Sequence, residues 1–184
     1  MGESKRVTHG GKISGMNDIS LAKATIRKHI LNLRKESNRS NAALTNNLLS
    51  VVQMHKPKRV GTYVSYPSEP ATADFLQKLV EQGIQVLVPE TLATGELAWH
   101  DFVDGNKLSL GSGDLLFVPA LAVDRFGNRL GRGKGYFDKE LALLSGVIVY
   151  AVVFEHEVLD LVPTEAHDKR VHGVVTQEQI LKIN

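Results

Sequence analysis

The chain has 184 residues, a formal net charge of +2 and no cysteine. This length suits one domain with a sizeable core, and so small a charge does not favour nucleic acid as the main partner. The lack of cysteine excludes disulfides, thiolate catalysis and cysteine-based zinc sites, and no apolar run reaches the length of a membrane span. We therefore expect a monomeric cytoplasmic protein with neither a nucleic-acid nor a membrane partner.

The first 18 residues are polar, rich in glycine and without periodicity, which predicts a disordered extension or a tag before a domain of residues 19–184. Apolar residues then recur at helical spacing from Ile19 to Lys35. The basic residues Lys23, Arg27 and Arg34 share one side of this helix. That basic stripe is either a solvated face or an anion-binding face.

A second helix is expected from Ser40 or Asn41 to Met54, followed by a βαβ unit over residues 59–89. The remaining strands are expected within residues 95–102, 114–123, 146–154 and 171–176, and the remaining helices within residues 136–144, 155–161 and 177–182. Alternation of this kind predicts an α/β fold, a single domain with a mainly parallel sheet and helices on both faces.

The segment VDRFGNRLGRGKGYFD, from Val123 to Asp138, lies between a strand pattern and a helix pattern. At its centre three glycines alternate with two cations, as Gly131, Arg132, Gly133, Lys134 and Gly135. Glycine lets the backbone approach a ligand closely, an arginine fork binds phosphate oxygens, and a lysine can follow a moving phosphoryl group. The spacing fits neither the dinucleotide fingerprint nor the P-loop. It predicts a polyphosphate-binding loop, with a flexible basic connection as the alternative.

Carboxylates elsewhere are candidates for the same sheet edge. Glu69 follows a predicted strand in a turn flanked by prolines, and is either a ligand-binding acid or an exposed turn residue. Tyr66, just before it, can stack on a flat ligand or pack in the core. Asp138 and Asp168 can hold Mg²⁺ against a polyphosphate, or can serve a helix start and a turn. The histidines form no zinc-ligand spacing.

The stretch VPALAVDRFGNRLGRGKGYFDK resembles the signature of the 5-formyltetrahydrofolate cyclo-ligase family, also called 5,10-methenyltetrahydrofolate synthetases. Weaker similarity at Lys23 and Arg27, YVSYPSEPAT and VPTEAHDKRVHGVVT extends the resemblance from about Ile19 to the end. It implies ATP- and Mg²⁺-dependent closure of 5-formyltetrahydrofolate to 5,10-methenyltetrahydrofolate, by phosphoryl transfer to the formyl oxygen, with release of ADP and phosphate.

The resemblance also implies a set of site residues. Lys134 and Arg132 would be catalytic, and Asp138 and Asp168 would bind magnesium. The residues implied for ATP are Lys23, Arg27, Arg129, Leu130, Gly131, Arg132, Gly133, Lys134, Gly135, Tyr136 and Phe137. Those implied for the folate are Val64, Tyr66, Glu69, Arg132, Gly133, Lys134, Gly135 and Tyr136.

The chain departs from the family's pattern in two places. The segment between Trp99 and Asp114 is shorter than usual and lacks a common Glu-Pro piece, which predicts an incomplete pocket rim. His172 stands where an acid is common, which predicts a changed charge near the magnesium site. Two other functions stay open. One is a non-catalytic folate- or nucleotide-binding relative, and the other is an RNA-binding module suggested by KGYF, although the residues after the tyrosine do not fit the RNP1 pattern.

Overall fold

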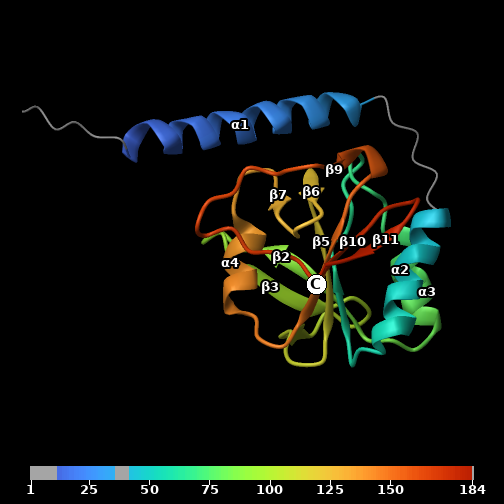
Figure 1. Ribbon diagram of the computed structural model, residues 1–184. Helices are drawn as coiled ribbons and strands as arrows, with labels where there is room; N and C mark the ends of the chain where they lie inside the picture. Colours follow the sequence, from blue (N-terminus) through green and yellow to red (C-terminus); the bar gives the residue numbers. More distant parts are fainter. Residues whose placement is uncertain (1–11, 36–41, 184) are drawn as a thin grey trace, which may run out of the picture.

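The computed structural model describes residues 12–35 and 42–183 of the chain, which fold around one large mixed sheet (Figure 1). In spatial order its strands are β11 (Ile180–Lys182), β10 (Gly173–Val175), β8 (Ile148–Val152), β5 (Leu115–Pro119), β1 (Val60–Thr62), β2 (Val86–Thr91), β3 (Leu97–Asp101) and β4 (Lys107–Leu108). The strands from β10 to β2 are parallel, and β11, β3 and β4 are antiparallel to their neighbours. The predicted α/β fold with a mainly parallel sheet is confirmed.

Side chains of the central strands enter two separate cores. In β5, Leu115 and Phe117 belong to one apolar cluster, whereas Leu116 and Val118 belong to the other. Helices α2 (Ala42–His55) and α3 (Ala73–Glu81) pack on the first cluster, and α4 (Tyr136–Leu143) packs on the second (Figure 1). Because successive residues of a strand point to opposite faces, an almost unbroken apolar strand needs cover on both sides. The prediction of helices on both faces is confirmed.

Helix α1 (Lys12–Leu33) runs across one end of the molecule, apart from the other helices (Figure 1). It begins at Lys12, before the expected start at Ile19, so part of the predicted extension is helical, and residues 1–11 lie outside the described part of the chain. Ile26 packs on a small cluster, and Ile30 is buried. None of the described helices is long and apolar enough to cross a membrane.

The expected single strand over residues 114–123 is wrong, because the chain leaves the large sheet after Pro119. Its continuation, β6 (Ala122–Asp124), forms a small second sheet with β7 (Arg129–Leu130) and β9 (Val158–Leu159). Two contacts explain the break. The carbonyl of Ala120 accepts a hydrogen bond from Arg34 Nη2 at 2.6 Å, and the amide of Leu121 donates to Leu130 O at 2.7 Å. The backbone groups between the two sheets are thus bonded to Arg34, directly after α1, and to β7.

Two expected helices are also wrong. Residues 155–161 form a short 3-10 turn, η1 (Glu155–Glu157), followed by β9, since Glu157 accepts the amide hydrogen of Phe154 at 2.9 Å. Residues 177–182 contain β11, since the hydroxyl of Thr176 accepts the amide hydrogens of the two residues that begin the hairpin. Side chains that bond to nearby backbone groups compete with helix formation in this way.

His172 lies away from the end of the sheet where β5 and β8 finish. Its backbone amide and Nδ1 bond to the backbone of Val149, at the start of β8. His172 does not line the cavity described below, and its effect on charge near the magnesium site stays a prediction.

Candidate active site

A cavity of about 660 Å³ opens where the parallel strands β1, β2 and β5 end. Its walls come from α1, the turn after β1, β2, β3, the glycine-rich loop, the start of α4 and a turn at residues 165–168. The structure brings to this cavity every residue that the sequence analysis named for ATP, folate or magnesium, from Lys23 to Asp168. It adds others, namely Ser20, Arg34, Tyr63, Ser65, Pro89, Thr91, Leu97, Pro119, Ala120, Glu165 and His167.

The glycine-rich loop, defined here as residues 131–135, is shaped by two left-handed glycines. Gly133 has φ +97° and Gly135, the N-cap of α4, has φ +72°. Residues other than glycine rarely adopt such φ values. At Gly133 a Cβ would also lie 3.4 Å from Cζ of Arg27. Arg27 Nε in turn donates to Gly131 O at 2.9 Å, so helix α1 fixes the start of the loop.

Lys23 is held between two carboxylates. Its Nζ donates to Glu165 Oε2 at 2.7 Å and to Asp168 Oδ2 at 2.6 Å, and its side chain is 6% exposed. Burial disfavours the charged ammonium, but the two carboxylates outweigh burial and raise the pKa of Lys23. For Asp168, burial is likewise outweighed, and hydrogen bonds from Lys23 and from the Glu165 amide lower the pKa of the carboxyl. The interpretation of the basic stripe as a solvated face is wrong.

Arg34, the third member of the stripe, forms a buried ion pair with Glu157. Its Nε lies 2.6 Å from Glu157 Oε1, and its Nη2 lies 2.8 Å from Oε2. The two side chains are 1% and 0% exposed. Since Nη2 also bonds to Ala120 O, Arg34 joins α1 to the break between the two sheets.

Arg129 and Asp138 form an ion pair at the end of the cavity near α4. Arg129 Nη2 donates to Asp138 Oδ1 at 2.7 Å, while Arg129 Nε is buried with no partner among the described residues. Burial lowers the pKa of Arg129, and the charges of Asp138 and Asp168 act in the opposite direction. Both carboxylates therefore lie near one guanidinium. Glu165 and His167 add ligand atoms within 4.8 Å of one another and of Asp168.

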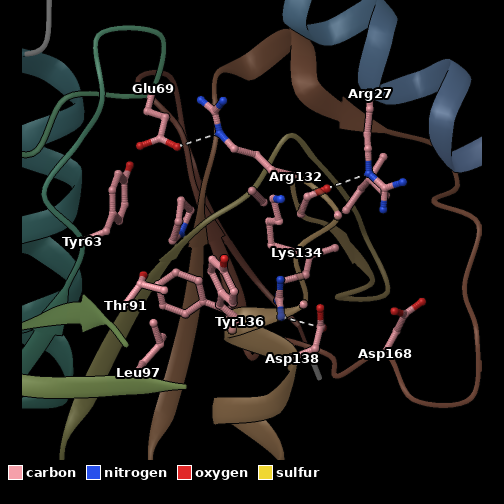
Figure 2. A pocket seen from close by; sticks show the side chains of 18 of the residues that line it. Arg27, Tyr63, Glu69, Thr91, Leu97, Arg132, Lys134, Tyr136, Asp138 and Asp168 are labelled. Carbon is pink, nitrogen blue, oxygen red and sulfur yellow. Dashed lines mark hydrogen bonds and ion pairs between the residues drawn. The ribbon is translucent and has the colours of Figure 1, made fainter. Parts of the chain in front are cut away.

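At the opposite end lies Glu69 (Figure 2). Its side chain is only 6% exposed, with Oε2 accepting the Tyr66 amide hydrogen at 3.0 Å and Oε1 lying 3.1 Å from Arg132 Nε. The exposed-turn interpretation of Glu69 is therefore wrong. Tyr66 and Val64 are exposed at the mouth, so the core interpretation of Tyr66 is wrong too. The buried Tyr63 hydroxyl donates to Pro70 O, and burial raises its pKa well above the usual value.

Lys134 lies between these two ends (Figure 2). It is exposed, and in the described part of the chain its ammonium has no hydrogen-bond or ion-pair partner. The cavity thus has an acidic end with paired cations, a buried carboxylate at the other end, and one unpaired cation between them. Such an arrangement can bind a polyphosphate and a flat polar ring side by side.

A model of the 5-formyltetrahydrofolate cyclo-ligase family matches residues 19–109 and 103–177. The chain belongs to this family. Among curated members it is 34% identical over 145 residues to the cyclo-ligase of Mycolicibacterium smegmatis, covering 66% of this chain and 75% of that protein. It is 27% identical over 173 residues to the cyclo-ligase of Mus musculus, covering 78% and 85%. As a cyclo-ligase, the protein is an ATP-dependent ligase.

Solved structures agree with this fold. The NMR structure of the Aquifex aeolicus 5,10-methenyltetrahydrofolate synthetase superposes with a TM-score of 0.74 at 22% identity, covering 88% of this chain and 93% of that one. A 5,10-methenyltetrahydrofolate synthetase from Mycoplasma pneumoniae superposes with a TM-score of 0.73 at 18% identity, covering 84% of this chain and 98% of that one. At such low identity the likeness concerns the fold alone.

Several residues that line the cyclo-ligase pocket were not predicted as site residues from the sequence. Glu165 and His167 could have been predicted, because both lie in the same short turn as Asp168. Thr91 and Leu97 had none, because they reach the cavity only through the antiparallel pairing of β2 with β3. No lining residue falls between Trp99 and Asp114, so an incomplete rim on that side stays a prediction.

Proposed function

We propose that the protein catalyses the ring closure of 5-formyltetrahydrofolate to 5,10-methenyltetrahydrofolate in this cavity. ATP would bind at the end lined by Lys23 and Arg27, and the pterin ring at the Glu69 end. The supporting observation is that one cavity contains the phosphate-binding loop, the paired cations and a buried carboxylate. At 660 Å³ its volume falls within the range of ligand pockets, about 300–1,000 Å³.

The reaction needs activation of a poor leaving group. Transfer of the γ-phosphoryl group to the formyl oxygen releases ADP and gives an iminium phosphate. N10 then attacks the formyl carbon, N10–H loses its proton, and the C–O bond breaks to release phosphate. Such a sequence requires alignment and charge stabilisation from the protein, and no protein nucleophile.

Lys134 and Arg132 are the catalytic cations of this proposal. Among residues 12–35 and 42–183, Lys134 has no competing hydrogen-bond or ion-pair partner, so its ammonium can stay with the phosphoryl group during transfer. Arg132 presents a planar fork to phosphate oxygens. The other residues proposed for ATP are Lys23, Arg27, Arg129, Leu130, Gly131, Gly133, Gly135, Tyr136 and Phe137. The loop glycines allow close approach of the phosphates, and Arg27 keeps the loop in position.

The residues at the acidic end fit Mg²⁺. Asp138 and Asp168 both act on the same guanidinium, and Mg²⁺ prefers a few carboxylate oxygens together with phosphate oxygens and water. Asp138 and Asp168 would therefore hold the ion. When bound with ATP, it supplies neutralisation of the charge on the phosphate oxygens.

The folate end is proposed to consist of Glu69, Val64 and Tyr66, together with the loop from Arg132 to Tyr136. Glu69 is buried and aimed at the cavity, where it can accept hydrogen bonds from ring N–H groups. The exposed Tyr66 can stack on the ring at the mouth.

The test is the rise in near-ultraviolet absorbance of methenyltetrahydrofolate when the protein is mixed with 5-formyltetrahydrofolate and MgATP. An ATP-free sample is the control. ATP-dependent product supports the proposal, whereas absence of product from folded protein that binds ATP indicates a non-catalytic relative. Binding of RNA with strong salt dependence and no product would indicate the third function.

The proposal extends to a monomeric protein in the cytoplasm. Light scattering of the purified chain tests the first part, and fractionation of cells that express it tests the second. A stable dimer in solution would contradict the monomer.

A further inference from the structure

The ion pair between Arg132 and Glu69 joins the glycine-rich loop to the turn after β1 at the Glu69 end of the cavity (Figure 2). Arg132 Nε lies 3.1 Å from Glu69 Oε1, and its Nη2 donates to Ser68 Oγ at 3.0 Å. The arginine side chain is 43% exposed, whereas that of Glu69 is 6% exposed and also holds the Tyr66 amide. The cation can therefore leave, and the carboxylate cannot follow it.

The proposed function requires a different partner for each of the two residues. Glu69 has to accept hydrogen bonds from the pterin, and Arg132 has to bind phosphate, so their ion pair has to open. The pterin carries N–H groups at N3 and at its 2-amino nitrogen, side by side in one plane. The Nε and Nη2 edge of Arg132 presents the same pair of donors, with Nε directed to Glu69 Oε1 and Nη2 to Ser68 Oγ. The ring edge thus fits the place that Arg132 occupies against Glu69 and Ser68.

We propose that Arg132 occupies the pterin's binding position at Glu69 when no folate is bound. Folate then displaces the Arg132 side chain from Glu69, and the freed guanidinium binds the phosphates of ATP. This inference rests on the proposed function. If ATP binds first, recruitment of Arg132 leaves the buried Glu69 without its cation, which carries a cost in free energy. If folate is present, that cost has already been removed. Each ligand therefore tightens binding of the other by the same factor.

The loop permits this exchange without moving its backbone. Gly131 O stays bonded to Arg27, and Gly133 keeps its left-handed conformation on the other side of Arg132. Only the exposed arginine side chain has to change rotamer, which takes picoseconds to nanoseconds. The exchange therefore requires the Arg132 ion pair to open and no rearrangement of the loop backbone.

Calorimetry of the full chain tests the coupling, with Mg²⁺ and the non-hydrolysable β,γ-imido analogue of ATP as the probe. With saturating 5-formyltetrahydrofolate, the Kd of the analogue should fall by about fivefold or more in the wild type. In Arg132→Leu the two values should be equal. Arg125→Gln is the matched control, because Arg125 is exposed, stacks on Phe126 and does not line the cavity, and it should keep the coupling.

Glu69→Gln separates this exchange from a structural role of the carboxylate. The variant should bind the analogue without folate more tightly than the wild type, by about twofold or more, because Arg132 is no longer retained. Weaker analogue binding by a folded Glu69→Gln, or equal Kd values with and without folate in the wild type, would overturn the inference. If the wild type turns over substrate but shows no coupling between the two ligands, the exchange is contradicted and the proposed function still holds. If the wild type neither turns over nor binds folate, both the exchange and the proposed function are contradicted.

Discussion

Helix α1 and the glycine-rich loop bring cations to the same cavity in opposite states. On the helix and at the residue directly after it, Lys23 and Arg34 have side chains 6% and 1% exposed, and each bonds to carboxylates at 2.6–2.8 Å. On the loop, Arg132 is 43% exposed with one carboxylate at 3.1 Å, and Lys134 has no partner among the described residues. Burial with a partner fixes a charge in place, whereas exposure leaves it available for a ligand. The helix therefore positions the site, and the loop supplies the charges that react.

The largest effect is expected at the helix. Arg34→Met leaves the buried Glu157 carboxylate without its cation, which should reduce the free energy of unfolding by about 3–5 kcal/mol. Urea denaturation followed by circular dichroism measures this. The double variant Arg34→Met with Glu157→Leu removes the unpaired charge and should recover part of the loss. An unchanged midpoint for the single variant would show that α1 does not depend on this ion pair.

Substitution in the glycine-rich loop should affect activity and leave stability nearly unchanged. Lys134→Ala should leave the unfolding midpoint near that of the wild type, because the exposed ammonium has no hydrogen-bond or ion-pair partner among the described residues. It should lower kcat by about 10² or more, the scale observed when one electrostatic donor to a transition state is removed. Lys139→Ala, an exposed lysine of α4 that does not line the cavity, is the matched control. A normal kcat in Lys134→Ala would end the catalytic assignment.

A substitution at Lys23 tests whether its ammonium competes with a metal ion for the carboxylates of Glu165 and Asp168. Lys23→Met removes the ammonium between Glu165 and Asp168, so nucleotide-free protein should bind Mn²⁺ at least about fivefold more tightly by electron paramagnetic resonance. Binding of the imido analogue of ATP should weaken, since a cation that the proposed function assigns to ATP is lost. Lys28→Met, at an exposed position of the same helix, should change neither. Unaltered Mn²⁺ affinity in Lys23→Met would argue against a metal at Asp168.

The sequence predicted the residues of the cavity better than it predicted their partners. Helical spacing found α1 and its basic side, and the glycine spacing found the loop, because both signals are local. That Lys23 would bond to Asp168, 145 positions away, depends on how α1 docks across the small sheet. No local pattern carries this information.

The same limit explains the errors in secondary structure. The apolar run over residues 114–123 has the composition of one buried strand, yet it is divided between two sheets because Arg34 takes the carbonyl of Ala120. Likewise β11 forms because β10 offers it an edge, although its own sequence is too short to decide between helix and strand. Long-range hydrogen bonds decided both cases.

The smallest expected effect concerns Asp168 and sharpens the distinction between fixed and available charges. Its pKa is lowered in the folded protein, so its contribution to stability is present above the unfolded value of about 3.9 and is lost as pH falls through the folded value. Asp168→Asn should therefore be less stable than the wild type at pH 7 and pH 5, by less than about 1 kcal/mol, and the difference should be smaller at pH 3, below the unfolded value. Urea midpoints at the three pH values measure it. A difference that persists unchanged at pH 3 would mean that Asp168 stabilises the turn through its shape, and not through its charge opposite Lys23.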